Sequence, residues 1–281
     1  MKCYICDSPD FKIRKGSVRD NKDVEIRECL SCELVYLSDQ SHIDNGHYEN
    51  SGMFGAKIPS VEYLRRDALS DNERRYEMLR HLISNKSVLD FGCGSGGFIQ
   101  KAQNIVSTIE GVEIEERMYG DLREKNRMHL TLETVQGKFD VITAFHVIEH
   151  LKDPREILKQ LREKLINDGV LIIEVPSAND ILASLYDCEE FQNFTYWSQH
   201  LYLFNQFTLK KLAMQAGFEV LSVQQYQRYT LANHIYWLSR GKIGGHKNWS
   251  FLDTPDLSSA YKNMLAINGM CDTLVAYLKR D

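Results

Sequence analysis

Residues 88–98 decide the fold, and they read Val88-Leu89-Asp90-Phe91-Gly92-Cys93-Gly94-Ser95-Gly96-Gly97-Phe98. An apolar run leads into a glycine-rich turn, and a helical pattern opens at Gly97. The glycines allow a sharp turn and let the backbone approach a ligand closely. The order of strand, turn and helix therefore predicts a βα unit that binds a nucleotide or nucleoside.

Strands and helices alternate on both sides of this turn. Strands are predicted at Ser87–Phe91, Thr108–Ile114, His129–Leu132, Phe139–Phe145, Val170–Val175 and Phe218–Val223. Helices are predicted at Val61–Ile83, Gly97–Ile105 and Glu115–Asn126, and another opens at Asp153-Pro154 with Asp153 as its N-cap. The run Val170–Val175 is almost continuously apolar, as in buried parallel strands. We therefore expect an α/β fold with a Rossmann-like, doubly wound, mostly parallel sheet.

The remaining segments predict smaller parts around this core. We expect a zinc-ribbon module over 1–42, a linker and lid helix over 43–85, the core over 86–225 and a helical C-terminal cap over 226–281. The last amphipathic helix of the cap is predicted at Leu257–Leu278. His47 and Tyr48 precede the first long helix and are candidates for a lid over the cofactor.

Composition narrows the class of protein. The chain has 281 residues, 43% hydrophobic and 26% charged, which is typical of a globular protein. Its net charge of −5 argues against a nucleic-acid partner, which favours basic surfaces. No run of about 18 apolar residues is present, so we expect no membrane span. The N-terminus lacks the apolar core of a signal peptide, so we expect a cytoplasmic location.

Four of the seven cysteines form two matched pairs, Cys3-x2-Cys6 and Cys29-x2-Cys32. Two such turns brought together supply the four thiolates that structural zinc prefers. Incidental cysteines or two redox pairs are the alternatives. A closed sulfur shell leaves no position for a substrate, so the predicted zinc holds the module together.

An acidic residue follows the turn at the distance expected for a ribose ligand. Glu113 lies 21 residues after Gly92, at the end of the next strand. The alternatives are a dinucleotide, S-adenosylmethionine and an inactive remnant of either site. Asp90, just before the first glycine of the turn, would repel a pyrophosphate but suits a cationic amino-acid ligand. The motif therefore favours S-adenosylmethionine.

These segments resemble the class I S-adenosylmethionine-dependent methyltransferases, in particular the ubiquinone O-methyltransferases and the sugar methyltransferases. The matching stretches are VLDFGCGSGGF, GVEI, FDVITAFHVIEHLKDP, DGVLIIEVPS and QHLYLF. Some members carry an N-terminal zinc ribbon. The resemblance implies that Asp90, Gly92, Gly94 and Gly96 frame the methionine end, with Cys93 inside the same turn. It implies further that Glu113 holds the ribose, Glu133 the adenine, and Phe145 and His146 the sulfonium.

The reactive side is predicted just past the fourth strand. His146, Glu149 and His150 share one face if this stretch is helical. His150 is the candidate general base, because histidine accepts a proton near neutral pH. Related enzymes hold a metal with a Glu-x-x-Glu-His pattern and a downstream histidine, so Glu149, His150 and His200 are candidate ligands of a second divalent metal. His146 replaces the first glutamate of that pattern, which argues against magnesium. A purely structural role is the third alternative.

The subgroup resemblance implies a small-molecule acceptor, such as the hydroxyl of a sugar or nucleotide-sugar, and a role in carbohydrate biosynthesis. A C-methyltransferase of a keto-sugar, an RNA methyltransferase and a non-catalytic cofactor-binding module are the alternatives.

Overall fold

The computed structural model describes residues 2–280 except 45, 51, 55–56 and 119–126. Its centre is a seven-stranded sheet with the order β10-β11-β8-β7-β4-β5-β6. All neighbouring pairs are parallel except those of β11, which runs antiparallel to β8 and β10. The strands are β4 (Ser87–Phe91), β5 (Thr108–Val112), β6 (Arg127–His129), β7 (Phe139–Phe145), β8 (Leu165–Pro176), β10 (Glu219–Tyr226) and β11 (Thr273–Lys279). The predicted doubly wound α/β sheet is thereby confirmed.

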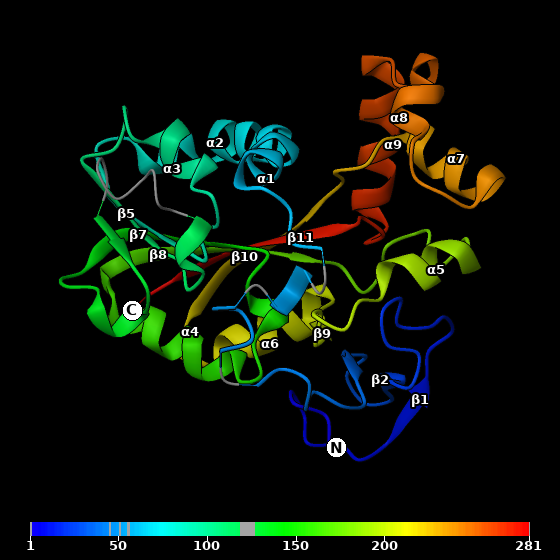
Figure 1. The fold of residues 1–281 in the computed structure, drawn as a ribbon, viewed down its shortest axis with the longest axis horizontal. Helices are drawn as coiled ribbons and strands as arrows, with labels where there is room; N and C mark the ends of the chain where they lie inside the picture. Colours follow the sequence, from blue (N-terminus) through cyan, green and yellow to red (C-terminus); the bar gives the residue numbers. More distant parts are fainter. Residues whose placement is uncertain (1, 45, 51, 55–56, 119–126, 281) are drawn as a thin grey trace.

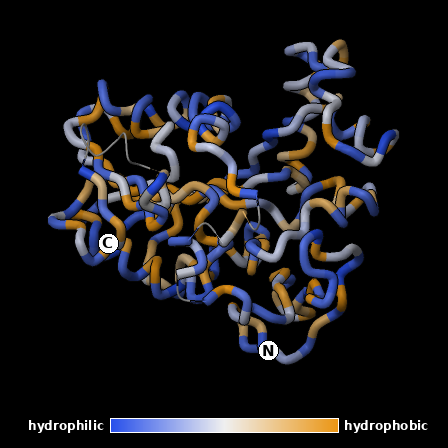
Figure 2. The backbone as a smooth tube through the Cα atoms, viewed as in Figure 1, coloured by the Kyte–Doolittle hydropathy of each residue, from blue (hydrophilic) through white to orange (hydrophobic). Residues whose placement is uncertain are grey.

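Helices cover both faces of the sheet (Figure 1). One face packs on α2 (Leu69–Ile83) and α3 (Gly97–Ala102), through side chains such as Leu79 and Phe98. The opposite face packs on α4 (Pro154–Glu163) and α6 (Gln206–Gln215), and the N-terminal residues join the same hydrophobic cluster. Hydrophobic residues accordingly concentrate along the central strands (Figure 2). The glycine-rich turn thus lies at the carboxyl edge of a sheet that is buried on both faces.

The helix predicted over Val61–Ile83 divides in two. It consists of α1 (Val61–Asp67) and α2, which meet at Ala68. At the other end of the core, α4 begins as predicted, because the Asp153 side chain accepts a hydrogen bond from the Glu156 amide and Pro154 occupies the first turn. The predicted helix at Glu115–Asn126 lies mostly outside the described residues, and its described part includes the short 3-10 turn η2 (Glu116–Met118).

The predicted terminal helix over Leu257–Leu278 is wrong beyond Ile267. Helix α9 (Pro255–Ile267) ends there, and 273–279 form β11, the reversed strand of the sheet. Asn268 and Gly269 are helix-stop residues, with φ +69° at Gly269. The run from Leu274 to Leu278 is largely buried because its side chains join the hydrophobic clusters on the two faces of the sheet, while its backbone pairs with β8 and β10.

Residues 227–272 leave the sheet after β10 and return to it at β11. They form α7 (Leu231–Arg240), α8 (Gly245–Asn248), η6 (Ser250–Leu252) and α9, which project from the core (Figure 1). The two ends of this excursion are joined, because the Gln227 side-chain amide donates to Asp272 at 2.6 Å and the Asp272 amide donates back to Gln227 at 3.1 Å. The backbone amides of Arg228 and Tyr229 also donate to the Asp272 carboxylate.

The N-terminal segment forms a second sheet with the order β1-β2-β3-β9. Its strands are β1 (Phe11–Ile13), β2 (Ile26–Cys29), β3 (Val35–Leu37) and β9 (Tyr202–Leu203). The first three belong to the cysteine-containing segment, but β9 comes from the chain between the core helices α5 (Glu189–Thr195) and α6. Among the described residues, the helices are all too short or too polar to cross a lipid bilayer.

Candidate functional site

The glycine-rich turn is held against the end of β5. The amides of Gly92 and Cys93 both donate to the Val112 carbonyl, at 2.8 and 3.0 Å. Gly92 has φ +70°, and a Cβ there would lie 2.4 Å from Val147. Gly94 has φ +52°, but a Cβ there would meet nothing nearer than the Met118 methyl at 4.0 Å. Among the described residues, open space therefore lies beside Gly94, where a ligand can approach the backbone.

Glu113 follows β5 directly and faces this turn. Its carboxylate accepts the Gly94 amide at 2.8 Å and the Glu115 amide at 2.9 Å. Burial raises the pKa of Glu113. The turn and this carboxylate thus lie together beside Gly94. A carboxylate in this position can accept hydrogen bonds from the ribose hydroxyls of a nucleoside.

Asp90 lies inside the sheet, below the turn. Only 2% of its surface is exposed, and Thr143 of β7 donates to its carboxylate at 2.7 Å. Burial raises the pKa of Asp90 to about 7. Direct contact between Asp90 and the methionine end of a cofactor stays a prediction.

We expect Asp90→Asn to stabilise the ligand-free protein in a pH-dependent way. The unfolded chain ionises this carboxyl near pH 4. The folded state holds the proton up to about pH 7, so the stability cost of Asp90 grows as pH rises from 4 to 7 and is complete above 7. Asparagine retains an acceptor for Thr143. Thermal unfolding should show an increase of roughly 5 °C at pH 8 and much less at pH 5.

Asp140, near the other end of β7, provides the control. Hydrogen bonds from Ser87 lower the pKa of Asp140, so Asp140→Asn should instead lower the unfolding temperature at pH 8. A stabilisation by Asp90→Asn that did not change with pH would contradict the assignment.

The chain turns sharply after β7. Phe145 ends the strand and packs edge-on against Phe98 of α3, with ring centroids 5.1 Å apart. His146 follows with φ +54°, a conformation that is uncommon for a residue with a side chain. The short 3-10 helix η5 (Ile148–His150) comes next. This turn brings the predicted reactive residues together although they do not share an α-helix.

The His146 ring lies between two buried carboxylates. Nδ1 is 3.1 Å from Glu149, and Nε2 is 3.1 Å from Glu174 of β8. Burial alone would lower the pKa of His146, but hydrogen bonds to the two carboxylates raise it. Both ring nitrogens are therefore engaged, and this arrangement favours the imidazolium form.

Glu174 is the centre of an ionic network that sequence analysis missed. It is completely buried, and it accepts hydrogen bonds from Arg74 at 2.8 Å and from Arg75 at 2.7 Å, both on α2. Arg228 pairs with Asp71 of α2, and its Nη1 lies 3.2 Å from His146. Burial would raise the pKa of Glu174, but His146 and the arginines hold it well below its usual range.

His150 has one engaged and one available nitrogen. Nδ1 lies 2.8 Å from the Gln199 carbonyl, which can only accept, so Nδ1 carries the proton. Nε2 is then left with a lone pair, 4.0 Å from a Glu149 oxygen. Burial lowers the pKa of His150, so the ring is neutral at pH 7. A neutral imidazole with a free Nε2 can accept a proton or bind a metal.

Glu149, His150 and His200 come together as one donor cluster. One ligand atom from each lies within 4.8 Å of the others. The His150 and His200 ring centroids are 5.0 Å apart. Burial lowers the pKa of His200 to about 3, so this ring is also neutral. Glu149 is completely buried, and its Oε2 has no hydrogen-bond partner within the described part of the chain.

The four paired cysteines also come together. Their sulfur atoms all lie within 4.8 Å of one another, with Cys3–Cys32 and Cys6–Cys29 separations of 3.4 and 3.5 Å. Four thiols at this spacing fit a tetrahedral zinc site, in which the ion would hold the two knuckles together.

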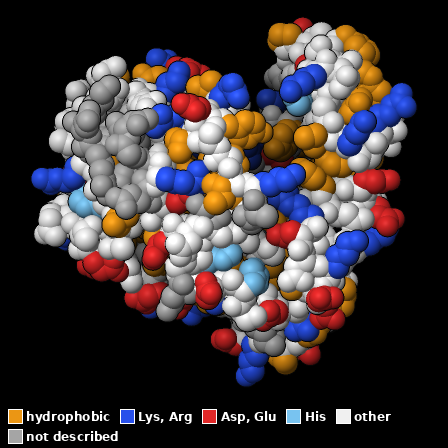
Figure 3. All heavy atoms as spheres, viewed as in Figure 1, with side chains coloured by type: hydrophobic (Ala, Val, Ile, Leu, Met, Phe, Trp, Pro, Cys, Tyr) orange, Lys and Arg blue, Asp and Glu red, His pale blue; other side chains and the backbone are white. Residues whose placement is uncertain are grey.

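The other predicted residues are placed as follows. Cys93 is half-buried in the turn, and a Cβ on Gly111 of β5 would lie 2.8 Å from its sulfur. Glu133 is exposed in the short turn after β6. His47 and Tyr48 lie over the reactive side, because His47 bonds the Gln199 side chain at 2.7 Å and the Tyr48 hydroxyl donates to the His150 carbonyl at 3.1 Å. Histidine side chains reach the surface below a notch between the α1–α3 and α7–α9 regions (Figure 3).

Comparison with known families and structures agrees with this geometry. The sequence model of a family described as a methyltransferase domain matches residues 62–223. The ubiquinone biosynthesis O-methyltransferase of Hydrogenovibrio crunogenus is 22% identical over 197 residues, which are 64% of this chain and 78% of that protein. The tRNA U34 carboxymethyltransferase of Histophilus somni is 30% identical over 112 residues, 34% of this chain and 35% of that protein.

Solved structures share the fold at low sequence identity. A plantazolicin methyltransferase, solved with a triazolic desmethylPZN analog and SAH, superimposes with a TM-score of 0.53 at 16% identity, covering 86% of this chain and 96% of that one. The magnesium protoporphyrin IX methyltransferase of Synechocystis PCC 6803, solved with SAH, gives 0.50 at 14% identity, covering 86% and 100%.

Proposed function

Because this chain belongs to the methyltransferase-domain family and is an S-adenosylmethionine-dependent methyltransferase, we propose that it methylates a hydroxyl of a small molecule, with a sugar or nucleotide-sugar as the acceptor class. The acceptor class derives from the subgroup resemblance of the glycine-rich turn and the segment after β7. The observation that carries the proposed chemistry is the free Nε2 of a neutral, buried His150.

His150 has the properties of a general base for a hydroxyl. The Gln199 carbonyl fixes the proton on Nδ1 and thereby presents the Nε2 lone pair. Burial keeps the ring deprotonated at neutral pH, before the substrate binds. An acceptor hydroxyl within hydrogen-bond distance of Nε2 would give its proton to that atom as the oxygen attacks the methyl group.

The cofactor would bind at the glycine-rich turn. S-adenosylmethionine, when bound, supplies an electrophilic methyl group. The backbone at Gly94 and the carboxylate of Glu113, which are hydrogen-bonded to each other, would hold the nucleoside. Phe145 ends β7, the strand that pairs with β4, and His146 follows it directly. In-line transfer would require the acceptor oxygen to line up with the methyl carbon of the bound cofactor.

We expect Glu113→Ala to abolish the thermal stabilisation that S-adenosylhomocysteine gives to the protein. The substitution removes the carboxylate that faces the turn, and NAD should stabilise neither form. The control is Glu115→Ala, which removes a different buried carboxylate two residues further along the chain. Unchanged stabilisation of Glu113→Ala by S-adenosylhomocysteine would exclude Glu113 as the ribose ligand.

A divalent metal at Glu149, His150 and His200 is the second candidate for the reactive side. The buried Glu149 Oε2 without a partner favours it, because such an atom is costly unless something is bound to it. One carboxylate and two neutral imidazoles suit zinc, iron or manganese better than magnesium. The metal would then polarise the acceptor hydroxyl in place of a base.

Metal removal separates the two candidates. If a metal acts, EDTA should abolish turnover and a divalent ion should restore it, and His200→Ala should be as inactive as the chelated enzyme. If His150 acts as the base, EDTA should leave the rate unchanged as long as the four-cysteine site keeps its zinc. Zinc content measured on the same samples shows whether the four-cysteine site has kept its zinc.

Turnover of a panel of nucleotide-sugars, followed by formation of S-adenosylhomocysteine, tests the acceptor class. Methylation of carbon next to a keto group would favour the C-methyltransferase alternative. Activity on RNA alone would contradict the small-molecule proposal. No product from any acceptor, with cofactor binding intact, would favour a non-catalytic role.

A further inference from the structure

The cysteine-containing segment shares one β-sheet with residues 196–203, which we call the reactive segment. Strand β3, which follows the second cysteine pair, runs antiparallel to β9, with Val35 opposite Leu203 and Tyr36 opposite Tyr202. The Leu37 amide donates to the Leu201 carbonyl at 3.1 Å. His200, one of the candidate catalytic residues, directly precedes this pairing.

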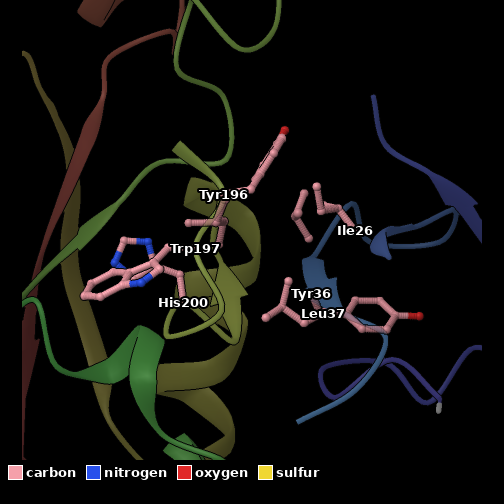
Figure 4. Close-up of a pocket in the computed structure, with 8 residues that line it drawn as sticks. Ile26, Tyr36, Leu37, Tyr196, Trp197 and His200 are labelled. Carbon is pink, nitrogen blue, oxygen red and sulfur yellow. The ribbon is translucent and has the colours of Figure 1, made fainter. Parts of the chain in front are cut away.

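The two segments meet at a small cavity. The cavity is lined by Ile26, Tyr36 and Leu37 from the N-terminal strands and by Tyr196, Trp197 and His200 from the reactive segment (Figure 4). The Trp197 and His200 rings lie edge-on, with centroids 5.3 Å apart.

Two further residues of the N-terminal segment hold the beginning of the reactive segment. The Arg19 guanidinium lies 4.5 Å from the centre of a Trp197 ring, and the Arg19 amide donates to the Tyr196 carbonyl at 2.9 Å. The Asp20 carboxylate accepts both the amide and the hydroxyl of Ser198, at 3.0 and 2.7 Å. The N-terminal segment therefore contacts residues 196–203 along their whole length.

The same short stretch sets the geometry of the donor cluster. The Gln199 carbonyl fixes the His150 tautomer, His200 contributes its own ring, and the Leu201 amide donates to the Glu149 carbonyl at 2.8 Å. Residues 199–201 therefore contact both His150 and Glu149 and include His200 itself. The cofactor turn, by contrast, rests on β4 and β5 of the core sheet and has no part in this pairing.

We infer that the four-cysteine module is a positioning element for the reactive histidines, acting through the β3–β9 pairing. The inference rests on the proposed function in so far as His150 and His200 act on the acceptor. Order in the cysteine site then controls the acceptor side of the active site, while cofactor binding is independent of it. The module's cysteines, Arg19 and Asp20 are positioning residues in this scheme.

The first experiment compares the full-length zinc-loaded protein with the same protein after zinc removal. About one zinc per chain is expected before removal. Removal should speed hydrogen exchange at the Leu201 amide by about tenfold or more. Turnover should fall roughly a hundredfold, as for a misplaced catalytic group, whereas the Kd for S-adenosylhomocysteine should stay within about twofold. Cys32→Ser should behave like the zinc-free protein, and Cys188→Ser, at a buried thiol outside the module, like the loaded one.

The second experiment leaves the cysteine site intact. Leu37→Pro removes the amide that donates to Leu201, while Leu37→Ala removes the same side chain but keeps the amide. Both proteins should retain zinc and bind S-adenosylhomocysteine. Faster exchange at Leu201 and lower turnover are expected of the proline variant relative to the alanine variant. The comparison of Leu37→Pro with Leu37→Ala tests the role of the β3–β9 pairing even if zinc removal unfolds the chain.

Protection at Leu201 that is unchanged in zinc-free protein and in Leu37→Pro would overturn the inference. Loss of cofactor binding together with turnover in the Leu37→Pro variant would also overturn it, since the module would then be a general requirement for folding. Because hydrogen exchange needs no acceptor, it tests the coupling even if the proposed hydroxyl methylation fails.

Discussion

Replacing His150 by asparagine is expected to lower kcat by about 10²- to 10⁴-fold, the range for loss of a general base. The asparagine side-chain amide takes the place of Nδ1 and can still donate to the Gln199 carbonyl, but Nε2 is lost. The substitution therefore removes the proton acceptor and keeps the local hydrogen bond. Steady-state turnover and calorimetric titration with S-adenosylhomocysteine measure the two effects separately, and the affinity should not change.

The pH profile gives an independent check on this role. The pKa of His150 lies below its ordinary value, so wild-type activity should be flat above pH 7 and fall on the acid side as Nε2 is protonated. Any residual activity of His150→Asn should lack this fall. His81, an exposed histidine on α2, provides the control, and His81→Asn should behave like the wild type. If His150→Asn and EDTA-treated enzyme both keep full turnover, neither chemical role holds.

Replacing Glu174 by glutamine is expected to lower the free energy of unfolding by about 3–5 kcal/mol, the cost of removing one partner from a buried ionic network. Two arginines and His146 donate to this completely buried carboxylate. Glutamine has almost the same shape but no charge, and half of its polar end is a donor facing other donors. Urea unfolding followed by circular dichroism measures the change.

An exposed ion pair on α2, the helix that carries Arg74 and Arg75, provides a comparison for this result. Glu77 pairs with Arg80 at 3.2 Å, and both side chains are more than half exposed. Glu77→Gln should therefore change stability by less than about 0.5 kcal/mol. Equal effects of the two substitutions would mean that the Glu174 network contributes no more than a surface pair.

Local signals in the sequence predicted the parts of the site that depend on neighbouring residues. The turn at Gly92–Gly96 needs only glycines in positive-φ conformations after an apolar strand, so the sequence pattern suffices. The two cysteine pairs likewise depend on tight local turns. Glu149, His150 and His200 were grouped by a family pattern, and the structure brings these three together.

Long-range pairing explains what the sequence did not reveal. Strand β11 comes after a helix and is reversed, so periodicity extended the helix over it. Glu174 within the apolar run Val170–Val175 was a usable signal, because a carboxylate in a buried strand requires a partner. Its partners, Arg74 and Arg75, lie about 100 residues earlier, and spacing alone could not identify them. The contact of His146 Nε2 involves the same distant glutamate, whereas Nδ1 contacts Glu149, three residues on.

The Gln227–Asp272 junction has a consequence for how this protein can diversify. The 46 residues between β10 and β11 begin and end at this junction, where the side chains and backbone of Gln227 and Asp272 are hydrogen-bonded. Insertions are tolerated best where the ends are close and anchored. We therefore expect insertions in the exposed turns of this excursion to be tolerated better than changes to its buried side chains, because Trp237 of α7 packs on Phe191 and Leu265 of α9 packs on Ile181.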